Sequence, residues 1–188
     1  MIKLNQIEKI KEDLKNNLSE YRYEHSILVA QEAKKLACHY NVDEKKAYIS
    51  GLVHDIAKEF SEEENEYYIE KYNLPRFDSK FKSIIHSFVG AVYLKEKYDL
   101  DDDICEAVRV HTIGSLNMSL LDKIIFVADK IEPGKDYLGI EEERVVAKEN
   151  IDKAMILCLE NNYIKLKSLG KEMYPVSLEV LYHLKNIL

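Results

Sequence analysis

The apolar and polar residues alternate with a helical period along most of the chain. Residues 4–18 place Leu4, Ile7, Ile10, Leu14 and Leu18 at steps of three and four, the spacing of one face of an amphipathic helix. The same spacing recurs downstream, and no segment shows a convincing strand pattern. The further helices predicted in this way span about 21–40, 44–60, 61–72, 81–98, 104–113, 119–132 and 141–159, then another, less regular helix to 169, and a last one at 177–188. The sequence therefore predicts an all-α protein.

Capping and breaking residues set the predicted helix ends. The stretch 61–64, Ser-Glu-Glu-Glu, is typical of a capping box, and Asp43 is placed to cap the helix that follows it. The acidic runs 101–103 and 141–143 also precede helices, where negative charge complements the helix dipole. Pro133-Gly134 ends a helix, and we expect loops at 75–81, 135–140 and 170–175. With only six glycines and three prolines, and no repeat or linker, the 188 residues read as one domain.

One apolar run contains three groups that are costly to bury. Within Gly51–Lys58 the chain places His54, Asp55 and, one helical turn after the histidine, Lys58. Burying such groups costs several kcal/mol each unless they are paired or bound to a metal. An isolated His-Asp pair in a core is usually a hydrogen-bonded structural pair. On the predicted helix, however, adjacent side chains lie roughly 100° apart, so both could reach one ion beside the helix.

Four other predicted helices also carry a polar group at an apolar position: His25, His86, His111 and Asp129. Five separate helices with this feature suggest that the groups converge. Imidazole and carboxylate together suit a borderline divalent transition metal such as iron, manganese, cobalt, nickel or zinc. The alternative is that all five groups are paired structurally in the core. His39 and His183 lack a comparable context and are assigned to surface or packing.

Composition limits the kinds of partner that the protein is expected to bind and the compartment in which it is expected to work. The net charge of −7 argues against non-specific nucleic-acid binding, which needs a basic face. No apolar run approaches the ~20 residues of a membrane span, and the N-terminus has no long apolar core of a signal peptide. Cys38, Cys105 and Cys158 are widely spaced and form no CxxC, so we expect reduced thiols in a cytoplasmic protein. The 13 tyrosines would suit either a dimer face or the core, so a homodimer stays open.

The order of these residues resembles the signature of the HD-domain metal-dependent phosphohydrolases. The local sequences are similar to one branch of that family, the YqeK branch, which is known as a symmetrical diadenosine-tetraphosphate hydrolase. They are RYEH at 22–25, GLVHDIAK at 51–58, HSFVGA at 86–91, HTIG at 111–114 and ADKIEP at 128–133. The resemblance covers about residues 20–180. It implies a single HD-domain helical bundle over 1–188, with the metal-site core at about 20–135 and the C-terminal helices 141–188 packed on it.

The resemblance also implies a role for each candidate metal ligand. His25, His54, Asp55 and Asp129 match the metal ligands of the branch, with which iron is associated. His86 and His111 match positions that bind a second metal in many HD enzymes. In this branch they are expected to face substrate phosphates or a second, weaker ion.

The substrate contacts are carried over in the same way. Arg22, Lys58, His86, His111, Thr112 and Lys130 match positions near nucleotide phosphates, and Tyr174, Pro175, Val176 and Ser177 match a loop that lies against the nucleotide. Asp136 is also expected to contact substrate, although 136–139 departs from the aromatic-Pro-Gly that is usual there. Lys135 stands where the branch usually has arginine, so it keeps the charge but loses the bidentate fork.

Together these roles predict a hydrolase of a small dinucleoside polyphosphate. A divalent metal lowers the pKa of bound water from ~15.7 toward ~7. We expect such a water to attack an inner phosphate and release two ADP, with Asp55, His86, His111 and Lys58 as the catalytic side chains. Two alternatives stay open. One is another HD-domain nucleotide phosphohydrolase, a 5'-nucleotidase or guanosine alarmone hydrolase, and the other is a non-catalytic metal- or nucleotide-binding sensor.

Overall fold

The computed structural model describes residues 4–188, and the side chains from residue 6 onward. Residues 1–3 lie outside this description. So does the side chain of Leu4, the first apolar residue of the helix predicted for 4–18. Within the described part the chain forms helices and no strand, which confirms the all-α prediction. They are α1 (Leu4–Asn17), α2 (Glu20–His39), α3 (Glu44–Val53), α4 (Glu62–Tyr72), the 3₁₀ helix η1 (Ser79–Ile84), α5 (Ile85–Tyr98), α6 (Asp102–Val110), α7 (Leu120–Ile131), α8 (Ile140–Glu149), α9 (Ile151–Ser168) and α10 (Pro175–Ile187).

The predicted caps explain several of these helix starts. Asp43 accepts the backbone N–H groups of Lys45 and Lys46 at the start of α3. Ser61 and Glu64 form the predicted capping box of α4. A second capping box, between Ser119 and Asp122, starts α7. Local sequence therefore fixes where these helices begin.

The central helix is shorter than predicted. The range 44–60 was wrong beyond Val53, because residues 54–59 form successive tight turns in place of a helix. The Gly51 carbonyl would accept the Asp55 N–H in a continuing helix, but it receives the Nδ1–H of His54 at 2.7 Å. The turns then close through hydrogen bonds three residues back, such as that from the Lys58 N–H to the Asp55 carbonyl at 2.9 Å. The His-Asp pair and Lys58 consequently lie on a turn and not on one helix face.

Two other boundaries also differ from the predictions. The single helix predicted for 141–159 is broken at Asn150, whose extended backbone (φ −157°) ends α8. Its side chain accepts the N–H groups of Asp152 and Lys153 at 3.0 Å and so starts α9. The predicted loop around 174–177 is mostly helical, because Pro175 occupies the first turn of α10, where its missing N–H has no cost.

The helix expected to begin at Phe81 begins instead at Ile85. The residues just before it, Ser79–Ile84, form the 3₁₀ helix η1, so the expected loop at 75–81 ends within that helix.

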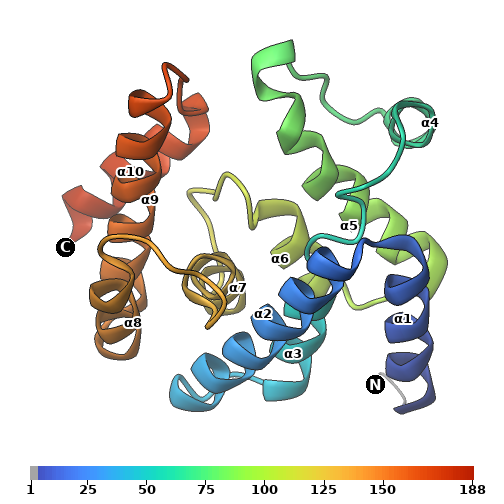
Figure 1. The fold of residues 1–188 in the computed structure, drawn as a ribbon, viewed down its shortest axis with the longest axis horizontal. Helices are drawn as coiled ribbons and strands as arrows, with labels where there is room; N and C mark the ends of the chain where they lie inside the picture. Colours follow the sequence, from blue (N-terminus) through green and yellow to red (C-terminus); the bar gives the residue numbers. More distant parts are fainter. Residues whose placement is uncertain (1–3) are drawn as a thin grey trace.

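The helices enclose two buried apolar clusters that meet along α2. One cluster joins α2, α6 and α7 to α8–α10, and the other joins α1–α3 to α5 and α6. Figure 1 shows α8–α10 on one side of the molecule and α1, α4 and α5 on the other, with α2, α3 and α7 between them. No described helix is long and apolar enough to cross a membrane.

Helices α2 and α3 approach each other closely at Gly51. A β-carbon at Gly51 would lie 2.8 Å from the Cα of Ala30, closer than real side chains come. Only glycine therefore fits here without a backbone shift. This close approach sets the His54 turn directly against α2, the helix that carries His25.

Candidate metal centre and active site

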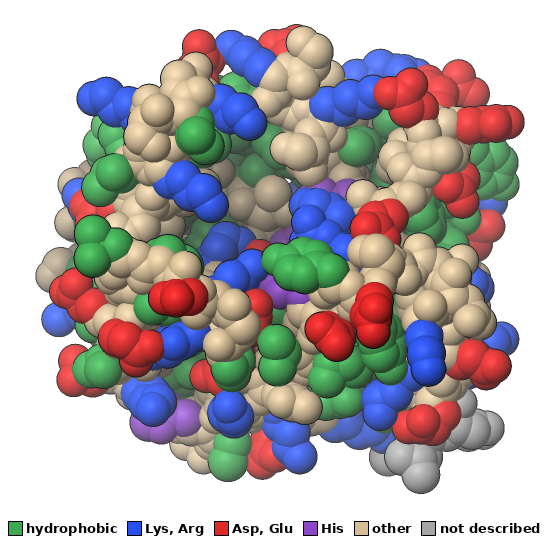
Figure 2. Space-filling view, viewed as in Figure 1, with side chains coloured by type: hydrophobic (Ala, Val, Ile, Leu, Met, Phe, Trp, Pro, Cys, Tyr) green, Lys and Arg blue, Asp and Glu red, His purple; other side chains and the backbone are tan. Residues whose placement is uncertain are grey.

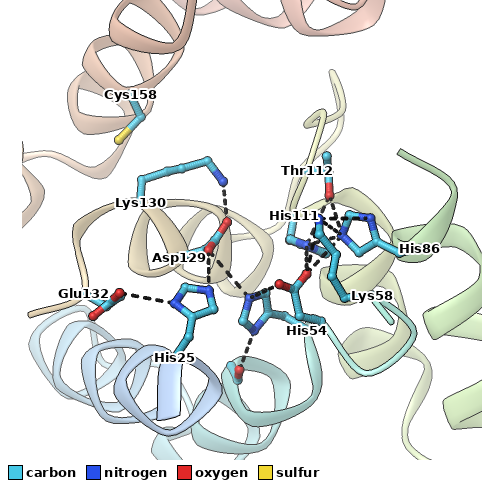
Figure 3. Close-up of polar contacts among 12 residues, drawn as sticks. His25, His54, Lys58, His86, His111, Thr112, Asp129, Lys130, Glu132 and Cys158 are labelled. Atoms are coloured by element: carbon cyan, nitrogen blue, oxygen red, sulfur yellow. Dashed lines mark hydrogen bonds and ion pairs between the residues drawn. The ribbon is translucent and has the colours of Figure 1, made fainter. Parts of the chain in front are cut away.

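The structure brings the six predicted histidine and aspartate side chains together. They come from α2 (His25), the turn after α3 (His54 and Asp55), α5 (His86), the end of α6 (His111) and α7 (Asp129). All are buried except Asp129, which is partly exposed. In Figure 3 the labelled imidazoles point toward a common centre from these separate elements. Three overlapping triplets of their donor atoms each lie within 4.8 Å of one another. By contact, the side chains form two groups that share Asp55: one around His54, with His25 and Asp129, and one with His86 and His111.

The first group surrounds an unsatisfied nitrogen. The Nε2 of His54 is fully buried and has no hydrogen-bond partner in the described part of the chain. It lies 3.6 Å from Asp129 Oδ1 and 3.7 Å from Asp55 Oδ2, and His25 Nε2 lies 3.1 Å from the same Asp129 oxygen. A buried polar atom without a partner needs an explanation, and the place of a ligand to an ion is one of the standard ones. Two imidazoles and two carboxylates fit a borderline divalent transition metal.

The second group shares Asp55 with the first. The Asp55 Oδ1 lies 3.1 Å from His86 Nε2 and 3.5 Å from His111 Nε2, and these two nitrogens are 3.2 Å apart. The hydroxyl of Thr112 lies 3.1 Å from the same atom of His111. Asp55 thus faces one group with each carboxylate oxygen. The second group could hold a weaker ion or bind phosphate oxygens.

Three of the histidines are oriented by the same backbone device. His54, His86 and His111 each donate Nδ1–H to the carbonyl three residues earlier in the chain, at 2.7, 2.6 and 2.6 Å. The accepting residues are Gly51, Ser83 and Val108. This hydrogen bond fixes the tautomer, so the lone pair of Nε2 faces the site in each case.

His25 is oriented differently, by a residue that the sequence analysis missed. Its Nδ1 lies 3.2 Å from Oε1 of Glu132, which is only 3% exposed. The other oxygen of Glu132 accepts the backbone N–H of Gly134. The sequence contained a clue to this role, because Glu132 lies three residues after Asp129 in the same ADKIEP motif, at the end of α7. Glu132 therefore positions a proposed ligand without facing the centre itself.

Burial and charge set the protonation of these groups. Burial disfavours ionised Asp55, but positive charge on the adjacent His54 holds the pKa of Asp55 well below the usual value. Burial likewise opposes ionised Asp129, yet Lys130 holds its pKa well below the usual range. Both carboxylates are therefore anionic, as metal ligands must be.

The histidines of the second group are neutral for the same physical reason. Burial lowers the pKa of His86, and it lowers the pKa of His111 to about 4. For His54, burial also opposes the charged form, but the charges of Asp55 and Asp129 raise its pKa. The negative charge of the pocket thus favours a cation at His54, either a proton or a metal.

Three predicted cations lie beside the ligands. Arg22 donates to Asp55 Oδ2 at 2.9 Å, Lys130 pairs with Asp129, and the Lys58 ammonium lies 3.3 Å from His86 Nε2. Burial lowers the pKa of Lys58. These side chains can meet phosphate oxygens bound at the centre.

The site opens into a cavity of about 430 Å³. Figure 2 shows this hollow, with histidine at its base and lysine or arginine around its rim. The predicted contacts Arg22, Lys58, Thr112, Lys130, Tyr174 and Ser177 line it, together with Lys135, the lysine that stands where the resembled branch usually has arginine.

Four other predicted contacts are not among the residues that line this cavity. His86 is buried beside Lys58 and Thr112, and Asp136 is exposed on the α7–α8 loop. Neither Asp136 nor Pro175 is among the lining residues, and Val176 lines a neighbouring hollow of about 350 Å³. The sequence analysis missed the lining residues Lys80, Asn162, Lys165 and Lys171, which no apolar context marks as unusual.

Comparisons with known proteins agree with this geometry. The family model "HD domain" matches residues 22–134. The chain is 37% identical over 168 residues to the symmetrical bis(5'-nucleosyl)-tetraphosphatase of Halalkalibacterium halodurans, covering 88% of this chain and 89% of the relative. It is 34% identical over 164 residues to the enzyme of the same name from Bacillus subtilis, covering 86% and 88%.

A solved structure has the same fold. It is a Clostridium acetobutylicum protein described as a predicted HD superfamily hydrolase involved in NAD metabolism. It superimposes with a TM-score of 0.89 at 34% identity, covering 97% of this chain and 98% of the other.

Proposed function

The chain belongs to the HD-domain family, as its sequence motifs predicted, and from this premise we propose that it hydrolyses diadenosine tetraphosphate symmetrically to two ADP. The observation that carries the proposal is the buried Nε2 of His54, which has no hydrogen-bond partner among the described residues and faces two carboxylates at the base of a cavity lined by cations. Relatives that cover almost the whole chain bear the name of this activity. The sequence and the geometry thus support the same chemistry.

We assign His25, His54, Asp55 and Asp129 as the residues that would hold the metal, and we propose iron. The nitrogen and oxygen donors suit iron and the other borderline divalent ions, and iron is the metal of the branch that the motifs resemble. A bound ion supplies Lewis-acid chemistry, since it lowers the pKa of water and polarises phosphate oxygens. His86 and His111, with Asp55 Oδ1, would bind a second, weaker ion or the phosphates.

The chain's own groups would divide the remaining work. Asp55 turns one carboxylate oxygen toward His54 and the other toward His86, so it would orient the attacking water. His86 is neutral with its Nε2 lone pair facing the site, so it would accept the proton of that water, whereas His111, whose pKa burial lowers to about 4, is the weaker base. The water oxygen joins one inner phosphorus, and the bridging oxygen leaves with the other ADP. Arg22, Lys58 and Lys130 would stabilise the charge that develops on the phosphate oxygens.

The identity of the products tests this proposal. Protein purified anaerobically with iron is mixed with diadenosine tetraphosphate, and the products are separated by chromatography. ADP alone, lost in His54→Ala and kept in the exposed control His183→Ala, is the expected result.

Other results would contradict the proposal in distinct ways. A mixture of AMP and ATP would overturn symmetrical cleavage while keeping the metal hydrolase. Faster release of phosphate from mononucleotides or guanosine alarmones would assign a different substrate. Bound nucleotide without turnover, with any divalent metal, would indicate a sensor.

We also propose that the protein acts in the cytoplasm as a single domain over 1–188. The three cysteines, two of them buried, form no disulfide, which supports a cytoplasmic location. The apolar cluster that joins the C-terminal helices to α2 and α7 supports a single domain. Light scattering would measure whether the active form is a monomer or a homodimer.

A further inference from the structure

The cavity is built from two parts of the chain. One part lies within residues 22–134, which match the HD-domain family, and carries the metal-ligand candidates. The other part lies beyond that match, at the end of α9 and in the segment that leads to α10. We call its polar members, Asn162, Lys165, Lys171 and Glu172, the C-terminal wall. Nothing in the proposed chemistry above requires these residues.

The cavity concentrates positive charge in a chain that is acidic overall. The whole chain carries a net charge of −7, whereas the described residues that line the cavity include seven lysine or arginine side chains and three acidic ones. Two of these acids, Asp55 and Asp129, are the proposed metal ligands. The third, Glu172, is paired with Lys80 at 2.6 Å. The remaining excess of cations attracts a highly charged anion such as a polyphosphate.

Five of the seven cations fall into two groups by position, and the other two are Lys80, which is paired with Glu172, and Lys135. Arg22, Lys58 and Lys130 lie against the metal ligands and contact them directly. Lys165 and Lys171 lie on the C-terminal wall and are exposed. Among the described residues 4–188, no carboxylate lies within ion-pairing distance of either ammonium. A single unpaired surface lysine is ordinary, but two that line one concave site can act together on one ligand.

Because the proposed substrate is symmetrical, each of its two halves needs a group of cations to bind its phosphates. If the central P–O–P bond lies at the metal, one nucleoside diphosphate extends along the first group of cations. The other must extend away from it, and it carries the same negative charge. The aromatic pair Tyr174 and Phe81, with ring centroids 5.0 Å apart, borders the same cavity and offers apolar surface to a base.

We propose that Lys165 and Lys171 bind the phosphates of the distal half of the substrate, the half that leaves as the second ADP. They would thereby select a dinucleoside polyphosphate over a mononucleotide. The identity of the substrate rests on the proposed function, whereas the binding of a polyphosphate anion by this wall does not.

The test compares the double variant Lys165→Gln/Lys171→Gln with wild type and with Lys167→Gln. Lys167 is exposed on the same helix but is not among the cavity-lining residues, so it controls for the loss of charge. Calorimetry measures binding of inorganic tripolyphosphate to each full-length protein, after the metal content of each has been matched. We expect about tenfold weaker binding in the double variant, because two exposed charge contacts are lost. Lys167→Gln should bind as wild type does.

Kinetics with diadenosine tetraphosphate give the second measurement. The KM of the double variant should rise about tenfold with kcat nearly unchanged, since the wall lies away from the reacting bond. Lys165→Arg/Lys171→Arg should restore both KM and tripolyphosphate binding, because arginine keeps the charge.

The possible failures are distinguishable. A double variant that matches Lys167→Gln in tripolyphosphate binding would overturn the role of the wall, whatever the substrate. Wild-type protein that leaves diadenosine tetraphosphate intact would overturn the proposed function, and the tripolyphosphate result would still decide whether the wall binds anions.

Discussion

The two sides of the cavity hold charge in contrasting ways. On the metal side the histidines and Asp55 are buried, and ligands are held by second partners, as His25 is by Glu132 and His54 by the Gly51 carbonyl. On the C-terminal wall, Lys165 and Lys171 are exposed and lack ion-pair partners among the described residues. Buried charge must be satisfied completely, so its geometry is fixed, whereas exposed charge costs little and stays adaptable. The difference suggests that one side supplies precise chemistry and the other supplies affinity.

The largest effect on activity is expected from removing the charge of Asp55, which the His54 group and the His86–His111 group share. Asp55→Asn keeps the size of the side chain but loses the anionic oxygens that face His54 on one side and His86 and His111 on the other. A metal stabilises the transition state by several kcal/mol, which corresponds to about a thousandfold in kcat. Product release measured by chromatography and metal content by elemental analysis should both fall.

The matched control for this variant is Asp103→Asn, which removes an exposed carboxylate that is paired with Lys46 outside the cavity. It should retain wild-type metal content and activity. If Asp55→Asn kept both as well, the shared carboxylate would not be essential, and the contrast between the two sides would fail.

A smaller effect is expected when the orientation of one ligand is loosened. Glu132→Gln can no longer fix the Nδ1–H tautomer of His25 by charge, because its amide can present either an acceptor or a donor. Loss of such an outer partner typically lowers metal affinity about 10–100-fold. Titration with a competing chelator measures the affinity, and thermal unfolding without metal monitors the fold.

The exposed Glu149→Gln on α8 serves as the control for the Glu132 variant. Equal metal affinity in both variants would show that His25 does not depend on Glu132 for its orientation.

The rigidity of the metal side can be tested through its backbone. Gly51→Ala places a methyl group 2.8 Å from the Ala30 Cα, so α2 and α3 must separate. Overpacking of this kind costs about 1–3 kcal/mol in the free energy of unfolding. Gly90→Ala is the control, because the nearest atom to its methyl group would be a Val108 side-chain carbon at 3.4 Å, an ordinary contact. Denaturant unfolding should therefore show a clear loss of stability for Gly51→Ala and little change for Gly90→Ala.

Equal stability of the two glycine variants would mean that α2 and α3 can separate at little cost in the free energy of unfolding. The close approach of α2 and α3 would then not explain the glycine at position 51.

The same contrast explains what the sequence could predict. Histidine and aspartate at apolar helix positions are anomalies that a periodicity analysis detects, so residues such as His54 and Asp129 are identifiable as candidate ligands from the sequence alone. The turn at 54–59 was not predicted, because it depends on the His54 side chain replacing a backbone donor at Gly51. The break at Asn150 was missed for a similar reason, since a side-chain cap interrupts an otherwise helical pattern.

The C-terminal wall could not be predicted at all. Lys165 and Lys171 are two of 27 lysines and arginines, and exposed lysine is the ordinary state of that residue. Only the fold shows that they share a cavity with residues more than a hundred positions earlier, such as Arg22 and Lys58. Sequence alone thus identifies buried candidate ligands more readily than exposed residues that bind substrate.

The smallest predicted effect changes the charge of the wall without touching the metal side. Glu172→Gln removes the one carboxylate of the wall and releases Lys80, which it holds at 2.6 Å. An anionic substrate should then meet less repulsion and one more available cation. We expect the KM for diadenosine tetraphosphate to fall about two- to fivefold, because exposed charges are strongly screened. Added salt should shrink the difference.

The control for this last variant is Glu160→Gln, which breaks another lysine–glutamate pair of the C-terminal helices, with Lys185, outside the cavity. The Lys80–Glu172 pair is exposed and the Glu160–Lys185 pair is partly exposed, so neither variant should shift the thermal midpoint appreciably. A lower KM in Glu172→Gln alone would show that charge within the cavity, and not net charge of the chain, sets affinity. An unchanged or higher KM would mean that Glu172 helps to hold η1 in place for binding, and the wall would then require fixed geometry just as the metal side does.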